Sequence, residues 1–404
     1  NLTTLLTAFV LMYFGLGPIK GFGTVLTVGI ISSMFTAILV GRLITDWWSE
    51  RAEMTYSHPW SEHWLVGVNI DWLGMRKWAY LFSGIITVVG IVSFATRGFE
   101  LGVDFKGGYS FNVQFDRPVQ EEQLRPALTE ALGGNPIVKA VSTENTYNIT
   151  TSYLINDRSQ DVMDKVTAKL HEGLQKAGFD TKLEDFKNTD GTGTHITSST
   201  QVGPTVADDI RNSSIMATIW GLLAIFLYLL VRFRKWQFSM GAVIALFHDV
   251  IITLTFFSLL HGLVPFSLEI DQAIIACILT VIGFSVNDTV IVYDRIREFI
   301  NTYAGRPKEE VLNMAINTTL SRTMITSGTI IAVVLILFLF GGGALKSFSF
   351  GMLIGMVFGT YSSVFIAAAL VVDMTKEKVL VGQAVESKPA AAAPASKKEK
   401  ATVK

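Results

Sequence analysis

Long apolar segments constrain the fold of this chain more than any other feature. A helix that crosses the hydrocarbon core of a membrane needs about 20 mostly apolar residues. Eight segments approach or reach that length: Leu2–Leu16, Phe22–Ile44, Trp78–Phe94, Ile215–Val231, Phe238–Leu260, Ile270–Tyr293, Thr323–Phe340 and Phe350–Val372. Of the 404 residues, 50% are hydrophobic and 17% are charged, which is less charge than soluble domains carry. Because helices satisfy their own backbone hydrogen bonds in lipid, we predict a polytopic α-helical membrane protein.

The lysine and arginine residues predict how these segments are oriented. They gather near Arg76, near Arg232, between Arg295 and Lys308, and from Lys376 onward. All four places fall on one side if all eight segments cross the membrane, and loops rich in positive charge face the cytoplasm. The long polar stretch 98–212 is then extracytoplasmic, and the C-terminus is cytoplasmic.

The polar stretch 98–212 has the pattern of a small α+β domain. Apolar and polar side chains alternate from Ser110 to Phe115, as they do in a half-buried strand. Amphipathic helices are predicted at Val119–Leu132 and Asp157–Ala177, and further strands at Ile137–Val141 and Thr146–Tyr153. A strand, a helix, two strands and a helix in this order indicate a ferredoxin-like fold.

Two parts of the chain resemble each other. Gly17–Phe22 aligns with Gly343–Phe348, and each is a glycine-containing turn with one lysine between two apolar segments. Repeated bundles are typical of membrane transporters. We therefore interpret the first two segments as the end of a bundle whose earlier helices lie upstream of Asn1, and the chain as a fragment or a processed product.

Two charged residues within the apolar segments are the main candidate site. A charge at the centre of a membrane costs about 2.5–3.5 kcal/mol on insertion scales. Asp288 lies 18 residues after Ile270, and Arg322 lies 19 residues before Gly341, so the helical rise places both at similar depth on antiparallel neighbours. This predicts an Asp288–Arg322 ion pair. The pair serves either as a static structural contact or as a proton relay, and the residues alone leave both roles open.

His248 and Asp249 form a second charged position inside an apolar segment. Adjacent residues point about 100° apart on a helix, so only one of them faces Asp288 directly. We take Asp249 and His248 as secondary relay candidates, with structural hydrogen bonding as the alternative role.

No enzyme site is recognisable in the sequence. It contains neither a Gly-rich phosphate loop nor a histidine pair with metal-ligand spacing, and Cys277, its single cysteine, lies in an apolar run. We therefore expect no enzymatic activity, no cofactor and no metal. The net charge of -1 gives no indication of a nucleic-acid partner. The energy source is then an ion gradient or a partner's nucleotide hydrolysis.

Several strings resemble the SecD and SecF family of export proteins, part of the RND superfamily. Leu101–Gly108 is similar to the Gly-Gly motif after the first SecF helix, with Gly107 and Gly108 as its glycines. Phe247–Asp249 resembles a motif in the third SecF helix. Val281–Thr289, which includes Asn287, and Asp294–Glu298 resemble the fourth helix. Asn317–Thr323 resembles the start of the fifth helix. The stretch Asn1–Ile44 resembles the last two helices of SecD.

This resemblance implies a fused SecDF arrangement: an RND-like helix bundle with a small ferredoxin-like extracytoplasmic domain. The chain would then divide into the last two helices of a SecD-like bundle (1–46), a cytoplasmic linker (47–75), the first SecF-like helix (76–97), the extracytoplasmic α+β domain (98–212), a five-helix membrane region (213–373) and a disordered cytoplasmic tail (374–404).

The resemblance also implies a function in the bacterial inner membrane. Members of the family use the proton motive force to help draw exported polypeptides out of the SecYEG channel, and their proton-relay residues correspond to Asp288 and Arg322 here. The implied partners are SecYEG, membrane proteins of the YajC and YidC type, the translocating polypeptide, membrane lipid and the missing upstream SecD-like half. A proton gradient takes the place of a cofactor.

Two other functions stay open. An RND-type exporter of small molecules or lipids would need larger external pore domains than 98–212 provides. A scaffold that binds the translocon without transducing energy predicts that neutralising Asp288 is harmless. The coupling ion is open as well, because a carboxylate with serine and threonine oxygens nearby can hold Na⁺.

Overall fold

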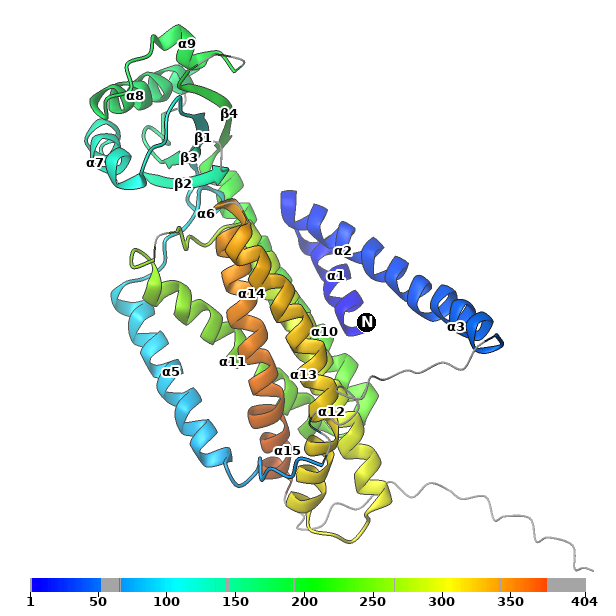
Figure 1. The fold of residues 1–404 in the computed structure, drawn as a ribbon. Coiled ribbons are helices and arrows are strands. Elements are labelled where there is room, and N and C mark those ends of the chain that lie inside the picture. Colours follow the sequence, from blue (N-terminus) through cyan, green and yellow to red (C-terminus); the bar gives the residue numbers. More distant parts are fainter. Residues whose placement is uncertain are drawn as a thin grey trace, which may run out of the picture.

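Long helices form a bundle that carries a small α+β domain at one end (Figure 1). The computed structural model describes residues 2–51, 65, 67–134, 136–142, 145–157, 159–189, 191, 193–264, 266–341 and 343–375. Much of the predicted linker 47–75 and nearly all of the predicted tail 374–404 lie outside the described residues.

The bundle is built from the apolar segments. Its helices are α1 (Leu2–Phe14), α2 (Gly17–Phe35), α3 (Gly41–Ser49), α5 (Arg76–Thr96), α10 (Pro204–Phe233), α11 (Trp236–Leu260), α12 (Gln272–Thr302), α13 (Lys308–Phe340), α14 (Gly343–Ser362) and α15 (Ala368–Met374). Among the described residues, seven continuous helices have the length and composition to cross a membrane. The first apolar segment, Leu2–Leu16, contains the apolar helix α1, of which this chain holds 13 residues, and the chain turns at Gly17, where φ is +53°.

Two helices extend well beyond their predicted apolar segments. α12 continues past Tyr293 to Thr302, and α13 begins at Lys308 rather than at Thr323. These added turns are polar, so they did not contribute to the apolar signal. They project at the end of the bundle opposite the α+β domain (Figure 1).

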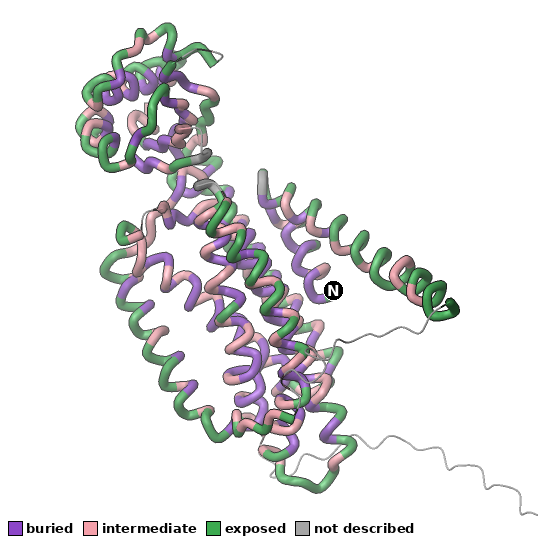
Figure 2. The backbone as a smooth tube through the Cα atoms, in the orientation of Figure 1, coloured by how far each residue is buried: buried purple, intermediate pink, exposed green. Residues whose placement is uncertain are grey.

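α12 lies at the centre of the bundle. It packs against α1, α11, α13 and α14, and most of its length is buried (Figure 2). By contrast, α5 packs along α11 and leaves side chains such as Trp78 and Val88 exposed. An exposed apolar face suits a helix that borders lipid, whose tails are as apolar as leucine.

The internal repeat appears as the same irregularity in two helices. α2 runs for 19 residues before a π-helical turn at Thr36–Val40, and α14 runs for 20 residues before a π-helical turn at Ser363–Ala367. π-Helical turns are rare. With Gly17 aligned to Gly343, the two π-helical turns begin within one residue of each other, which supports the repeat that was predicted from the two glycine turns.

The α+β domain is a four-stranded antiparallel sheet with helices. Its elements are β1 (Gly108–Gln114), α7 (Glu121–Leu132), β2 (Ile137–Ser142), β3 (Thr146–Thr151), α8 (Val162–Lys176), α9 (Leu183–Lys187) and β4 (His195–Val202). The strand order β2-β3-β1-β4 with this connectivity is ferredoxin-like. Phe111 and Val113 are fully buried, as their alternation predicted. β4 was missed because its sequence, HITSSTQV, is largely polar and mostly exposed.

The α+β domain is attached to the bundle at the start of α12. The Gly102 N–H donates to the Ile270 carbonyl at 2.9 Å, and the Ile270 N–H donates to the Glu100 carbonyl at 2.7 Å. Lys139 of β2 forms an ion pair with Glu269 and lies 3.7 Å from Asp271. Backbone pairing and a charge pair thus join the two parts, just before the short helix α6 (Val103–Lys106) leads into β1.

Candidate functional site

Asp288 sits in the interior of the bundle, on the central helix α12. Its side chain is 6% exposed, and the Ser327 hydroxyl of α13 donates a hydrogen bond to its Oδ2 at 2.7 Å. A narrow void beside it is bordered by Gly355 and Gly359 of α14. The carboxylate is buried, as the sequence indicated, but its hydrogen-bond partner is a serine hydroxyl rather than the predicted arginine.

The predicted Asp288–Arg322 ion pair is not formed. Among the described residues no ion pair within 4.0 Å joins Asp288 to Arg322, and Arg322 is exposed on α13. On that helix Thr323 and Ser327 are buried toward α12, and Arg322, one residue before Thr323, points about 100° away. Depth along two helices was predictable from sequence, whereas rotation about the axis of α13 was not.

His248 and Asp249 are brought together with hydroxyl groups of neighbouring helices. Asp249 is fully buried. Its Oδ1 lies 3.0 Å from His248 Nδ1, and its Oδ2 accepts from Ser285 of α12 at 2.6 Å and from Ser362 of α14 at 2.9 Å. Both side chains therefore belong to one buried polar cluster, which spans three helices.

Of the two serines in this cluster, Ser285 was predicted from the sequence to lie on the same helical side as Asp288, whereas Ser362 was not singled out. Ser285 lies one helical turn before Asp288 on α12, and Ser362 immediately precedes the π-helical turn of α14. Hydroxyls are common in membrane helices because they can bond to their own backbone. A serine indicates a buried polar cluster only when the face of the helix on which it lies is known. The charged residues therefore indicated this cluster more strongly than the serines did.

The two glycines of the family motif adopt a backbone conformation that favours glycine. Gly107 and Gly108 adopt φ values of +74° and +150° where α6 meets β1, a backbone region that other residues rarely occupy. Asn287 is half-buried and immediately precedes Asp288 on α12.

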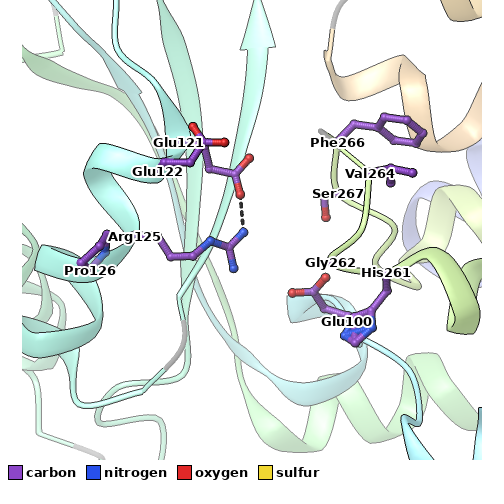
Figure 3. A pocket seen from close by; sticks show the side chains of 10 residues that line it. All are labelled: Glu100, Glu121, Glu122, Arg125, Pro126, His261, Gly262, Val264, Phe266 and Ser267. Carbon is purple, nitrogen blue, oxygen red and sulfur yellow. Dashed lines mark hydrogen bonds and ion pairs between the residues drawn. The ribbon is translucent and has the colours of Figure 1, made fainter.

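A polar pocket separates the α+β domain from the bundle. Figure 3 shows Glu121, Glu122 and Arg125 of α7 on one side and the turn around His261 on the other, with Glu100 below. Its volume is about 550 Å³. Arg125 pairs with Glu121 across one helical turn. Among the described residues no group of three His, Cys, Asp or Glu side chains is arranged to hold a metal ion.

A multispan helical bundle with an appended ferredoxin-like domain and buried carboxylates defines an integral membrane protein of transporter-like architecture. A sequence profile described as protein export membrane protein SecD/SecF, C-terminal, matches residues 181–377. A second profile, the SecD/SecF GG motif, matches residues 92–119 and includes Gly107 and Gly108.

Curated relatives point to the same family. Protein translocase subunit SecF from Rhodothermus marinus is 46% identical over 306 residues, covering 76% of this chain and 93% of the relative. Protein translocase subunit SecF from Escherichia coli O157:H7 is 35% identical over 317 residues, covering 78% of this chain and 91% of the relative. The chain belongs to the SecD/SecF family of protein export membrane proteins, and within it to the SecF type.

Longer relatives carry a fused architecture. Protein translocase subunit SecDF from Thermus thermophilus is 31% identical over 382 residues, covering 92% of this chain and 47% of the relative. The crystal structure of SecDF from that genus superposes with a TM-score of 0.75 at 28% identity over 92% of this chain. The chain spans about half the length of these fused proteins.

Proposed function

We propose that this chain is the SecF-containing part of a membrane motor that uses the proton motive force to promote polypeptide export by the Sec translocase. Membership of the SecF family supports the export role. Asp288 carries the energetic part of the proposal: it is a buried carboxylate in the middle of a spanning helix, held by a serine hydroxyl rather than by an ion pair. A carboxylate without a locked cation is available to take up and release a proton.

Arg322 has a switching role in this proposal. Its side chain is exposed on α13 and forms no ion pair within 4.0 Å with Asp288, whose hydrogen-bond partner is Ser327 of the same helix. A change in its distance from Asp288 would change how strongly the ionised carboxylate is favoured. This is the arrangement expected of a relay rather than of a static pair.

The fused SecDF arrangement is also part of the proposal. Similarity to the fused relatives extends over 92% of the chain, and the π-helical turns after α2 and α14 recur within one residue of each other in the repeat. We infer that α1 to α3 close a SecD-like bundle whose other helices belong to the upstream half. The partners are then SecYEG, YajC- and YidC-type proteins, the exported polypeptide and lipid of the inner membrane, with the α+β domain extracytoplasmic.

Replacing Asp288 by asparagine tests the motor function. Asp288→Asn keeps the shape of the side chain and removes the titratable charge, so proton-gradient-stimulated export should fall to the level seen without a gradient. The measurement is export into membrane vesicles containing the full-length protein, with and without a proton gradient, at matched protein levels.

Asp294→Asn is the matched control for this test. Asp294 lies on the same helix and pairs with Arg232 at 3.0 Å, but its side chain is 40% exposed, where ion pairs contribute little. Stimulated export should therefore persist in this variant. Full stimulation of export in Asp288→Asn would instead favour a translocon scaffold. Stimulation of export by a sodium gradient alone would identify Na⁺ as the coupling ion.

A further inference from the structure

A line of polar side chains leads from Asp249 toward the end of the bundle opposite the α+β domain. His248 Nδ1 lies 3.0 Å from Asp249 Oδ1, and its Nε2 lies 3.0 Å from the Ser83 hydroxyl of α5. Ser83 in turn lies 3.1 Å from the Tyr361 hydroxyl of α14. Four groups that can each pass a proton are thus joined by three hydrogen bonds across α11, α5 and α14.

Further polar groups lie toward the loop end of α5, although among the described residues no hydrogen bond joins them to Ser83 or Tyr361. Ser83 lies seven residues after Arg76, the first residue of α5, which is about 10 Å along the axis. One turn closer to that end, the Tyr80 hydroxyl donates to Asp373 Oδ2 at 2.9 Å, and Arg76 pairs with Asp373 at 3.3 Å. Asp373 is 37% exposed, so a carboxylate in contact with solvent lies beyond Ser83 at this end of α5.

At its inner end, the line approaches Asp288. Ser285 donates to Asp249 and lies one helical turn before Asp288 on the same face of α12. Ser285, Asp288 and Gly359 border one narrow void, which has no room for a water molecule in this conformation. The Asp288-to-Asp249 step is therefore closed here, whereas the steps beyond Asp249 are already hydrogen-bonded.

We propose that Asp249, His248, Ser83 and Tyr361 form the cytoplasmic half of the proton path, which carries protons from Asp288 to the solvent beside Tyr80 and Asp373. The proposal rests on the proposed motor function and adds the exit route and its residues. It assigns His248 a transfer role and makes Ser83 the link between α11 and α5.

The transfer balances proton by proton. Protonated Asp249 gives its proton to His248 Nδ1, while the His248 Nε2 proton passes to Ser83 Oγ. The Ser83 hydroxyl proton passes to the Tyr361 oxygen. The Tyr361 hydroxyl, which donates to the Ala79 carbonyl at 3.0 Å in this conformation, turns away from that acceptor and gives its own proton to water. Asp249 ends ionised, Ser83 and Tyr361 remain neutral hydroxyls, and the imidazole has exchanged one tautomer for the other, which a ring turn restores.

Alanine at Ser83 breaks the line without removing a charge. In vesicles that contain the full-length protein, we expect Ser83→Ala to lower gradient-driven proton uptake at least tenfold, as followed by a pH-sensitive dye, together with stimulated export. Ser83→Thr keeps a hydroxyl and should restore most of both signals. Tyr361→Phe should give an intermediate loss, because water can replace a terminal hydroxyl.

Ser93→Ala is the matched control on the same helix. Ser93 is buried and bonds the Ser258 hydroxyl at 2.7 Å, away from the line. If both serines serve only to hold α5 on α11, the two alanine variants should lose similar thermal stability and keep proton uptake, and that result would overturn the proposal.

Asp288→Asn separates this proposal from the motor function. Loss of proton uptake in Asp288→Asn with normal uptake in Ser83→Ala would retain the motor and reject this route. Normal uptake in both variants would reject the motor and, with it, the route. Loss in both, with rescue by Ser83→Thr and normal uptake in Ser93→Ala, supports the route.

Discussion

Replacing Gly108 by alanine is expected to destabilise the α+β domain by about 2–6 kcal/mol. Gly108 has a φ of +150°, and a methyl group there would lie 2.5 Å from the Thr151 carbonyl oxygen and 3.1 Å from Val103. A strained backbone costs about 1–3 kcal/mol, and forcing an atom into a packed site costs about 1–3 kcal/mol more. The obstructing atom is backbone of the paired strand β3, so it cannot turn away.

Hydrogen exchange in the intact chain measures this loss. Amide protection should fall in β1 and in its neighbours β3 and β4, which pair with it along their length, while α12 keeps its protection. Gly134→Ala is the control, because Gly134 lies in the same domain and has open space around the added methyl. Equal protection in the two variants would show that the Gly-Gly motif is conformationally free at this position.

The fold was largely predictable because it depends on two strong periodic signals. Apolar length fixed the helices of the bundle, and alternation from Ser110 to Phe115 fixed β1. Both signals report what the chain buries. β4 carries neither, since it pairs at the sheet edge with polar side chains on its exposed face. The position of β4 is determined by its backbone pairing with β1, which the sequence of β4 alone does not indicate.

The candidate site was predictable in its charges and unpredictable in its contacts. A buried carboxylate such as Asp288 or Asp249 is costly enough to stand out in an apolar segment. The partner of each depends on the rotation of the facing helix by a fraction of a turn. That rotation brought Ser327 rather than Arg322 to Asp288. Side-chain packing over the whole bundle sets this rotation, so the sequence of a single helix does not predict it.

Replacing Lys139 by methionine is expected to loosen the α+β domain from the bundle by about 3–5 kcal/mol at neutral pH. Glu269 is 5% exposed and its Oε2 has no hydrogen-bond partner among the described residues, so Lys139 is its main compensation. Removing one partner of a buried pair leaves an uncompensated charge and typically costs that much. The measurement is thermal unfolding of the intact protein together with hydrogen exchange at β2 and at the start of α12.

Lys165→Met is the control for the loss of a lysine. Lys165 on α8 pairs with Asp161 at 3.2 Å, but its side chain is 48% exposed, so a change below about 1 kcal/mol is expected. If Lys139→Met behaves like Lys165→Met, the Lys139–Glu269 pair does not hold the two parts together.

The destabilisation in Lys139→Met should depend on pH with a defined sign. Burial raises the pKa of Glu269 above its ordinary value, and Lys139 opposes that increase. Without the lysine, the folded-state pKa rises further, so the native state binds more protons than the unfolded state between the ordinary and the raised pKa. The stability of the variant is therefore greatest below the ordinary pKa and is lost as the pH rises through the raised one. Adding Glu269→Gln to Lys139→Met should recover most of the loss and abolish this pH dependence, since no buried charge then remains at that position.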